Sequence, residues 1–75
     1  MEQKRSQVNQ LIQKSHDLMV KADKNYDQFY YKDAHALYIE SIEGFMQLLK
    51  MTTDDANFQD YVKQRLNYLM ERVGG

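Results

Sequence analysis

The side chains that could carry out chemistry are few and far apart in this chain. The two histidines, His16 and His35, lie in separate segments, and the sequence holds no cysteine. Histidine can act as a general base or as a metal ligand, but neither role finds a second group at a suitable spacing. The adjacent pair Asp54-Asp55 precedes an apolar segment, where carboxylates typically cap a helix. We therefore predict surface histidines and capping carboxylates, with no metal site and no cofactor.

The glycines do not form a phosphate-binding loop. Gly44 stands alone, and Gly74 and Gly75 are the last two residues of the sequence, whereas a phosphate loop needs several glycines close together. A catalytic site also needs a cleft that excludes water, and packed helices of this length leave little room for one. The sequence predicts that the chain is not an enzyme.

Length and charge limit the class of partner. The chain has 75 residues, 10 basic and 11 acidic, and a net charge of −1. This balance argues against nucleic-acid binding and against a polybasic membrane anchor. No apolar run reaches the roughly 18 residues of a membrane span, and the polar start MEQKRSQ does not resemble a signal peptide. We expect a cytoplasmic, monomeric domain that does not insert into a membrane.

The chain is expected to be helical almost throughout, because it has no proline and only three glycines. The apolar spacing predicts helices over about 6–27, 32–51 and 55–73, separated by the polar and aromatic stretches NYDQFYY and MTTDDAN. Ser6 is a candidate N-cap of the first helix, although this helix could also begin earlier. One of Thr53, Asp54 and Asp55 is the candidate N-cap of the third helix, and Gly74 is its candidate C-cap. The predicted fold is one all-α domain, 1–75, an antiparallel three-helix bundle.

Each predicted helix carries an apolar stripe, with residues recurring at spacings of three and four. The stripes are Val8, Leu11, Ile12, Ser15, Leu18, Met19, Ala22 and Tyr26; Ala34, Leu37, Tyr38, Ser41, Ile42, Phe45, Leu48 and Leu49; and Phe58, Tyr61, Val62, Arg65, Leu66, Leu69, Arg72 and Val73. Gly44 lies inside the second helix, where it costs about 1 kcal/mol relative to alanine. We interpret it as the point where a neighbouring helix crosses closely.

A few apolar residues fall outside these stripes. Ile39 and Met46 lie together on one flank of the second helix, Met70 lies beside Leu66 at the edge of the third stripe, and Val20 is a similar outlier on the first helix. Single exposed apolar residues are ordinary. Several of them along a groove between two helices would bind an amphipathic partner helix, for which flexible methionines are well suited. The pattern leaves both interpretations open.

The segment that starts at Tyr31, YKDAHALYIESI, resembles the second-helix signature of the MIT domain, the microtubule interacting and trafficking module. The pair Lys21-Ala22 lies nine residues before Tyr31, as in that family's first helix, and Tyr68-Leu69 resembles its third-helix Tyr-Leu. Together these matches span most of the chain. The family typically continues with Asp-Arg, whereas this chain has Met70-Glu71.

The resemblance implies a three-helix module that binds short C-terminal tails of ESCRT-III subunits and recruits a larger host protein to endosomal or midbody membranes. It implies that the tail lies between the second and third helices as a helix, or between the first and third as an extended strand, and that Leu69 lines the first of these grooves. Tyr68 is expected to be a packing residue. Combined with the off-stripe residues, the candidate partner-binding set is Ile39, Met46, Val62, Leu66, Leu69 and Met70.

Two other functions fit the same sequence. The exposed apolar flanks could meet a second copy, which would make the chain a structural, oligomerising bundle. Direct microtubule binding is a further alternative, although a domain of net charge −1 lacks long-range attraction for acidic tubulin tails.

Overall fold

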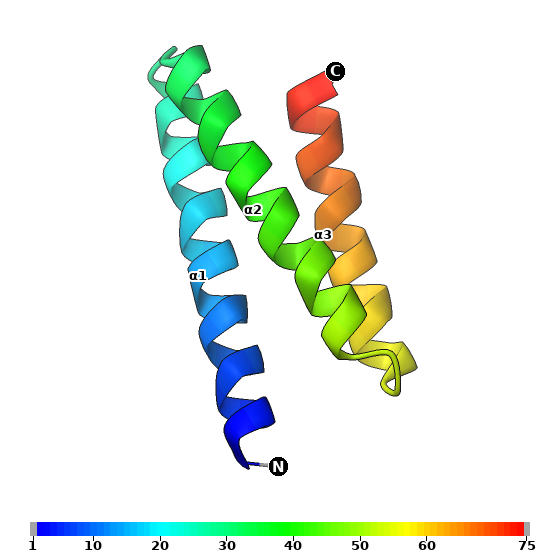
Figure 1. Ribbon diagram of the computed structural model, residues 1–75. Coiled ribbons are helices and arrows are strands. Elements are labelled where there is room, and N and C mark those ends of the chain that lie inside the picture. The colour runs from blue at the N-terminus through cyan, green and yellow to red at the C-terminus, as the bar shows by residue number, and fades with distance from the viewer. Residues whose placement is uncertain (1, 75) are drawn as a thin grey trace.

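Three antiparallel helices make up the described part of the chain, which in this computed structural model comprises residues 2–74, with side chains from residue 5 (Figure 1). They are α1 (Glu2–Asp27), α2 (Tyr31–Met51) and α3 (Ala56–Gly74). The predicted all-α three-helix bundle is confirmed, and both predicted breaks fall where they were expected. Among the described helices, none combines the length and the apolarity that a membrane crossing would require.

Two predicted helix ends are wrong. The first helix begins at Glu2 and not near residue 6, so Ser6 is an interior residue and not an N-cap; Glu, Gln, Lys and Arg at positions 2–5 are good helix formers. Gly74 belongs to the last turn of α3 and is not its C-cap. Residues 1 and 75, the ends of the predicted domain, lie outside the described residues.

The turn between α1 and α2 is a Schellman motif with phenylalanine in the position that favours glycine. The Tyr30 amide donates to the Asn25 carbonyl at 2.8 Å, and the Phe29 amide donates to the Tyr26 carbonyl at 3.1 Å. This pairing satisfies carbonyls at the end of α1. Phe29 has a φ of 68°, a left-handed conformation that is unfavourable for a residue with a Cβ, and its side chain is exposed.

The second turn ends in a side-chain cap. The Phe58 amide donates to Asp55 Oδ1 at 3.1 Å, so Asp55 is the N-cap among the three residues predicted. One residue further along α3 than Phe58, the Gln59 side-chain amide donates to the Leu49 carbonyl of α2 at 2.9 Å. The start of α3 is therefore fastened to the end of α2.

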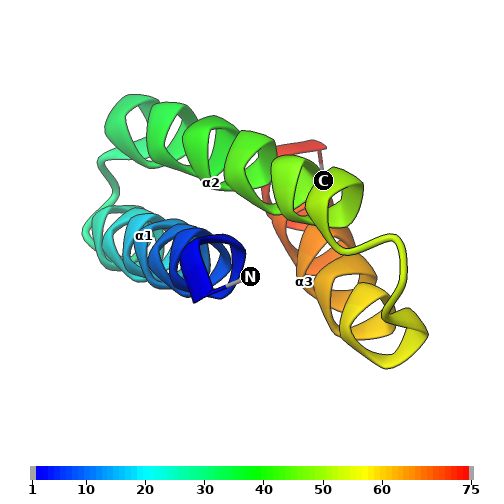
Figure 2. The same ribbon diagram turned by 60° about the horizontal axis from the view of Figure 1, so that its bottom comes forward.

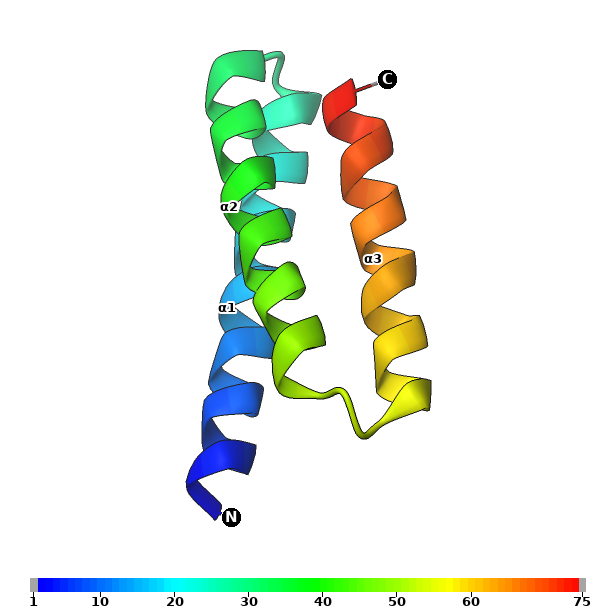
Figure 3. The same cartoon turned by 45° about the vertical axis from the view of Figure 1, so that its right-hand side comes forward.

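The middle helix, α2, holds the other two. It packs along α1 on one side and along α3 on the other, while α1 and α3 contact each other little. Figure 2 shows α2 lying over both neighbours, and Figure 3 shows α3 running beside α2 with its C-terminal end close to the α1–α2 turn. The buried apolar residues come from all three helices: Met19, Ala22, Ala34, Tyr38, Phe45, Leu48, Val62, Leu66 and Leu69.

Small residues allow α1 and α2 to approach closely. A Cβ built on Gly44 would lie 2.1 Å from Ser15 Oγ and 3.2 Å from Ser15 Cβ, so the predicted close crossing at Gly44 is confirmed. At the same level, the Ser41 hydroxyl donates to the Ser15 carbonyl at 2.8 Å. The Ser15 hydroxyl is itself buried and has no hydrogen-bond partner among the described residues.

This crossing predicts a coupled pair of stability changes. Ser15→Ala removes a buried unpaired hydroxyl and is expected to raise the free energy of unfolding by about 1 kcal/mol. Gly44→Ala in the wild-type chain gains helix propensity but drives the new methyl into Ser15, so the expected net loss is about 1 kcal/mol. In the Ser15→Ala background the hydroxyl is gone, and Gly44→Ala is expected to cost less by about 1 kcal/mol.

Urea unfolding followed by circular dichroism of the wild type, both single variants and the double variant measures this coupling. Strictly additive effects would show that the two residues do not contact each other as described.

Candidate functional site

The residues with potential for chemistry do not come together. His16 and His35 are both exposed and lie on different helices. Across the described residues, no group of three or more His, Cys, Asp or Glu side chains could hold a metal ion. Asp55 caps α3. The titratable groups that do converge are Asp23 and two tyrosines, which the sequence did not single out for a shared role.

The Asp23 carboxylate joins all three helices. From α2, the Tyr38 hydroxyl donates a hydrogen bond to Asp23 Oδ1. From α3, the Tyr68 hydroxyl lies 3.0 Å from Asp23 Oδ1 and 3.1 Å from Oδ2. Tyr38 is buried and Tyr68 is half-buried. We call these three residues the Asp23 junction. Hydrogen bonds to a charged acceptor are stronger than bonds between neutral groups, so the junction stabilises the packing of the three helices against one another.

The junction changes how its two phenols titrate. Burial raises the pKa of the Tyr38 phenol, and the hydrogen bond to the Asp23 carboxylate raises it further. The pKa of Tyr68 is raised by the same two causes in the same order. A phenolate beside a carboxylate would also lose its donated hydrogen bond, so both hydroxyls keep their protons at neutral pH.

An arginine covers the junction from α3. The Arg72 guanidinium carbon lies 4.8 Å from the Tyr26 ring centroid and 5.4 Å from that of Tyr68. The Tyr26 ring in turn meets the Tyr38 ring edge-on, with centroids 6.4 Å apart. These cation–π and aromatic contacts tie the C-terminal end of α3 to α1 and α2. A shallow hollow of about 250 Å³ beside them is lined by Tyr26, Tyr68, Glu71 and Arg72.

Part of this junction is predictable from the sequence. Tyr38 lies in the predicted apolar stripe of the second helix, and the prediction that Tyr68 is a packing residue agrees with its half-buried ring. Asp23 belongs to none of the apolar stripes and has no predicted role. A carboxylate on the flank of one apolar stripe, with a tyrosine on each of the other two helices, is the signal that could have identified it.

Three of the predicted partner-binding residues are core residues. Val62 and Leu69 are 0% exposed, and Leu66 is 6% exposed. They pack with Phe45 and Leu48 in the common core. In this arrangement almost no surface of these side chains is open to a partner, and their contact with a tail stays a prediction.

The other three predicted residues are exposed. Ile39 and Met46 of α2 are 40% and 47% exposed, and Met70 of α3 is 50% exposed. Ile39 and Met46 lie on the side of α2 that borders α3, beside the half-buried Ile42. Met70 lies on the side of α3 that borders α2. We call the surface formed by Ile39, Met46 and Met70 the α2/α3 edge.

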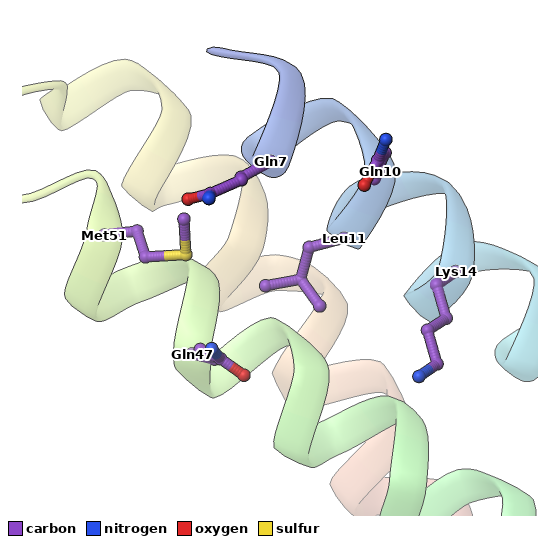
Figure 4. Close-up of a pocket in the computed structure, with 6 residues that line it drawn as sticks. All are labelled: Gln7, Gln10, Leu11, Lys14, Gln47 and Met51. Atoms are coloured by element: carbon purple, nitrogen blue, oxygen red, sulfur yellow. The ribbon is translucent and has the colours of Figure 1, made fainter. Parts of the chain in front are cut away.

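The surface hollows lie elsewhere. None of five shallow hollows in the described part of the chain is lined by residues of the α2/α3 edge. One of about 420 Å³ lies between α1 and α2, where Leu11 points toward α2 and Met51 toward α1 (Figure 4). Its remaining lining is polar: Gln7, Gln10, Lys14 and Gln47. The α2/α3 edge is therefore an exposed apolar surface that does not coincide with any of these five hollows.

Comparisons with protein-family models, curated proteins and solved structures find no match to this chain. The resemblance to MIT domains therefore depends on the residues quoted above and on their spacing.

The raised tyrosine pKa values predict a loss of stability at alkaline pH. In the unfolded chain both phenols ionise near pH 10, whereas in the folded chain they keep their protons to higher pH. The folded state thus binds more protons, so its stability is complete below about pH 10 and falls as the pH rises above that value.

Urea unfolding between pH 8 and pH 11 measures this dependence. Tyr68→Phe is expected to be less stable than the wild type at pH 8, by about 1 to 3 kcal/mol, because it loses the hydrogen bonds to Asp23. Its stability should fall less steeply above pH 10, because one shifted phenol is gone. Equal slopes for the two proteins would show that Tyr68 does not titrate as described.

Proposed function

We propose that this chain is a peptide-recognition module of the MIT type, which binds the C-terminal tail of an ESCRT-III subunit as a short helix along the α2/α3 edge. The observation that supports it most is the exposure of Ile39, Met46 and Met70, each between 40% and 50%, on the facing borders of two adjacent helices. The helices that border this edge also carry most of the residues that resemble the MIT family, namely the segment from Tyr31 and the pair Tyr68-Leu69.

The spacing of the edge suits an amphipathic helix. Ile39 and Met46 are seven residues apart, which places their side chains two turns and about 10.5 Å apart along α2. A partner helix with apolar residues at i, i+3 or i+4, and i+7 presents the same spacing. Methionine side chains are flexible and polarizable and can adapt to the residues of such a partner.

We also propose a recruiting role and a cellular location for this chain. A module that holds an ESCRT-III tail would recruit its host protein to endosomal or midbody membranes, where those subunits assemble; this part rests on the family resemblance. Binding is expected to be weak, with a Kd of roughly 1 to 100 μM, because a short helix on a small surface buries little area.

Isothermal titration with a panel of ESCRT-III tail peptides tests the proposal. Met70→Asp is expected to weaken binding at least about tenfold, because a carboxylate would be desolvated beneath the apolar face of the tail. Val20→Asp is the matched control, since Val20 is 49% exposed on α1 and away from the edge. Leu69→Asp is a poor probe because it would place a charge in the core.

Absence of heat with every tail at millimolar peptide would contradict the proposal, as would equal affinities for the Met70→Asp and Val20→Asp variants. Circular dichroism melts of both variants establish that they are folded. Sedimentation equilibrium addresses the alternative of an oligomerising bundle. A dimer that Met70→Asp dissociates would mean that a second copy covers the edge.

A further inference from the structure

Lys63 borders the α2/α3 edge on the α3 side. It precedes Met70 by seven residues, so the two side chains lie on the same face of α3, about 10.5 Å apart. Lys63 is exposed. Its side chain therefore extends from the border of α3 that faces α2, two turns before Met70.

The register of α2 and α3 places Lys63 beside an apolar residue of α2. The bond from the Gln59 side chain to the Leu49 carbonyl sets residue 59 opposite residue 49. Counting along the two antiparallel helices brings Met46 beside Lys63 and Ile39 beside Met70, each pair within about 3 Å along the axis. One end of the surface is therefore formed by Ile39 and Met70, and the other end by Met46 and Lys63.

Two more lysines lie close to this surface. Around α2, Lys32 is about 20° beyond Ile39 and Lys50 is about 40° beyond Met46, both on the side away from the core. Both lysines are exposed. They stand near the two ends of α2, so each end of the α2/α3 edge has a positive charge within reach of a long side chain.

One carboxylate also borders the edge. Glu43 lies four residues after Ile39 and three before Met46, about 40° to 60° beyond them around α2 and only about 20° beyond Lys32 and Lys50. On α3, Asp60 is about 60° beyond Lys63 and Glu71 about 100° beyond Met70. Three lysines and one carboxylate therefore surround the edge, which gives it more positive than negative charge although the whole chain has a net charge of −1.

We propose that the segment bound at the α2/α3 edge is an acidic amphipathic helix, with a carboxylate side chain facing Lys63. This inference rests on the proposed function and names the chemistry of the partner at that same surface. Apolar side chains of the partner cover Ile39, Met46 and Met70, and its carboxylate pairs with the lysine at the rim. Charge complementarity of this kind selects among helices that share the same apolar pattern.

Two synthetic helical peptides test the proposal by isothermal titration at low salt. Both carry leucines at i, i+3 and i+7, and they differ only in the residues that flank the two outer leucines, which are glutamate in one peptide and lysine in the other. Flanking both outer leucines makes the test independent of the direction in which the peptide lies. The proteins are the wild type, Lys63→Glu and, as a control with the same change of net charge, Lys21→Glu on the exposed face of α1.

The glutamate peptide is expected to bind the wild type about three to five times more tightly than the lysine peptide, the range of an exposed ion pair. Lys63→Glu should remove or reverse this preference, Lys21→Glu should preserve it, and about 1 M salt should abolish it. Equal affinities of the wild type for the two peptides, or equal effects of both substitutions, would overturn the acidic-partner inference alone. Failure of both peptides and of every ESCRT-III tail to bind would overturn the proposed function as well.

Discussion

The arrangement of the three helices depends on the hydrogen bonds that the Asp23 carboxylate accepts from Tyr38 and Tyr68. Helices α1 and α3 contact each other little, and Asp23 is the described side chain that hydrogen-bonds to both of the other helices. The apolar core presses α3 against α2, but hydrophobic contact is non-directional. The hydrogen bonds to Asp23 have direction, and together with the burial of the apolar face of α3 they fix its rotation and the position of its C-terminal end.

The rotation of α3 about its own axis determines which of its side chains are exposed. Val62, Leu66 and Leu69 face the core, and because a helix turns by about 100° per residue, their burial directs Met70 outward on the border with α2. The burial of three residues predicted to bind a partner thus determines where their neighbour Met70 is exposed. The exposed apolar surface and the buried core are two consequences of one rotation of α3.

The architecture followed from the sequence because it depends on local patterns. Apolar spacing, the absence of proline and the position of Gly44 indicated three helices and a close crossing, and the structure has both. Helix ends were less predictable: Ser6 is a good N-cap by residue type, yet the helix-forming residues before it continue α1. The burial of Val62 and Leu69 was ambiguous, because a helical wheel describes one helix alone and does not show how much of its surface the neighbouring helix covers. The bonds between Asp23 and the tyrosines join residues distant in the chain and depend on the finished packing.

Amide hydrogen exchange in the wild type and in Asp23→Asn tests most directly whether the Asp23 junction holds α3 in place. In Asp23→Asn, protection is expected to fall most in the C-terminal half of α3, around Tyr68 and Arg72, while the centre of the α1–α2 pair, around Ser15 and Gly44, keeps most of its protection. Unchanged protection in α3, or an equal loss in all three helices, would contradict this expectation.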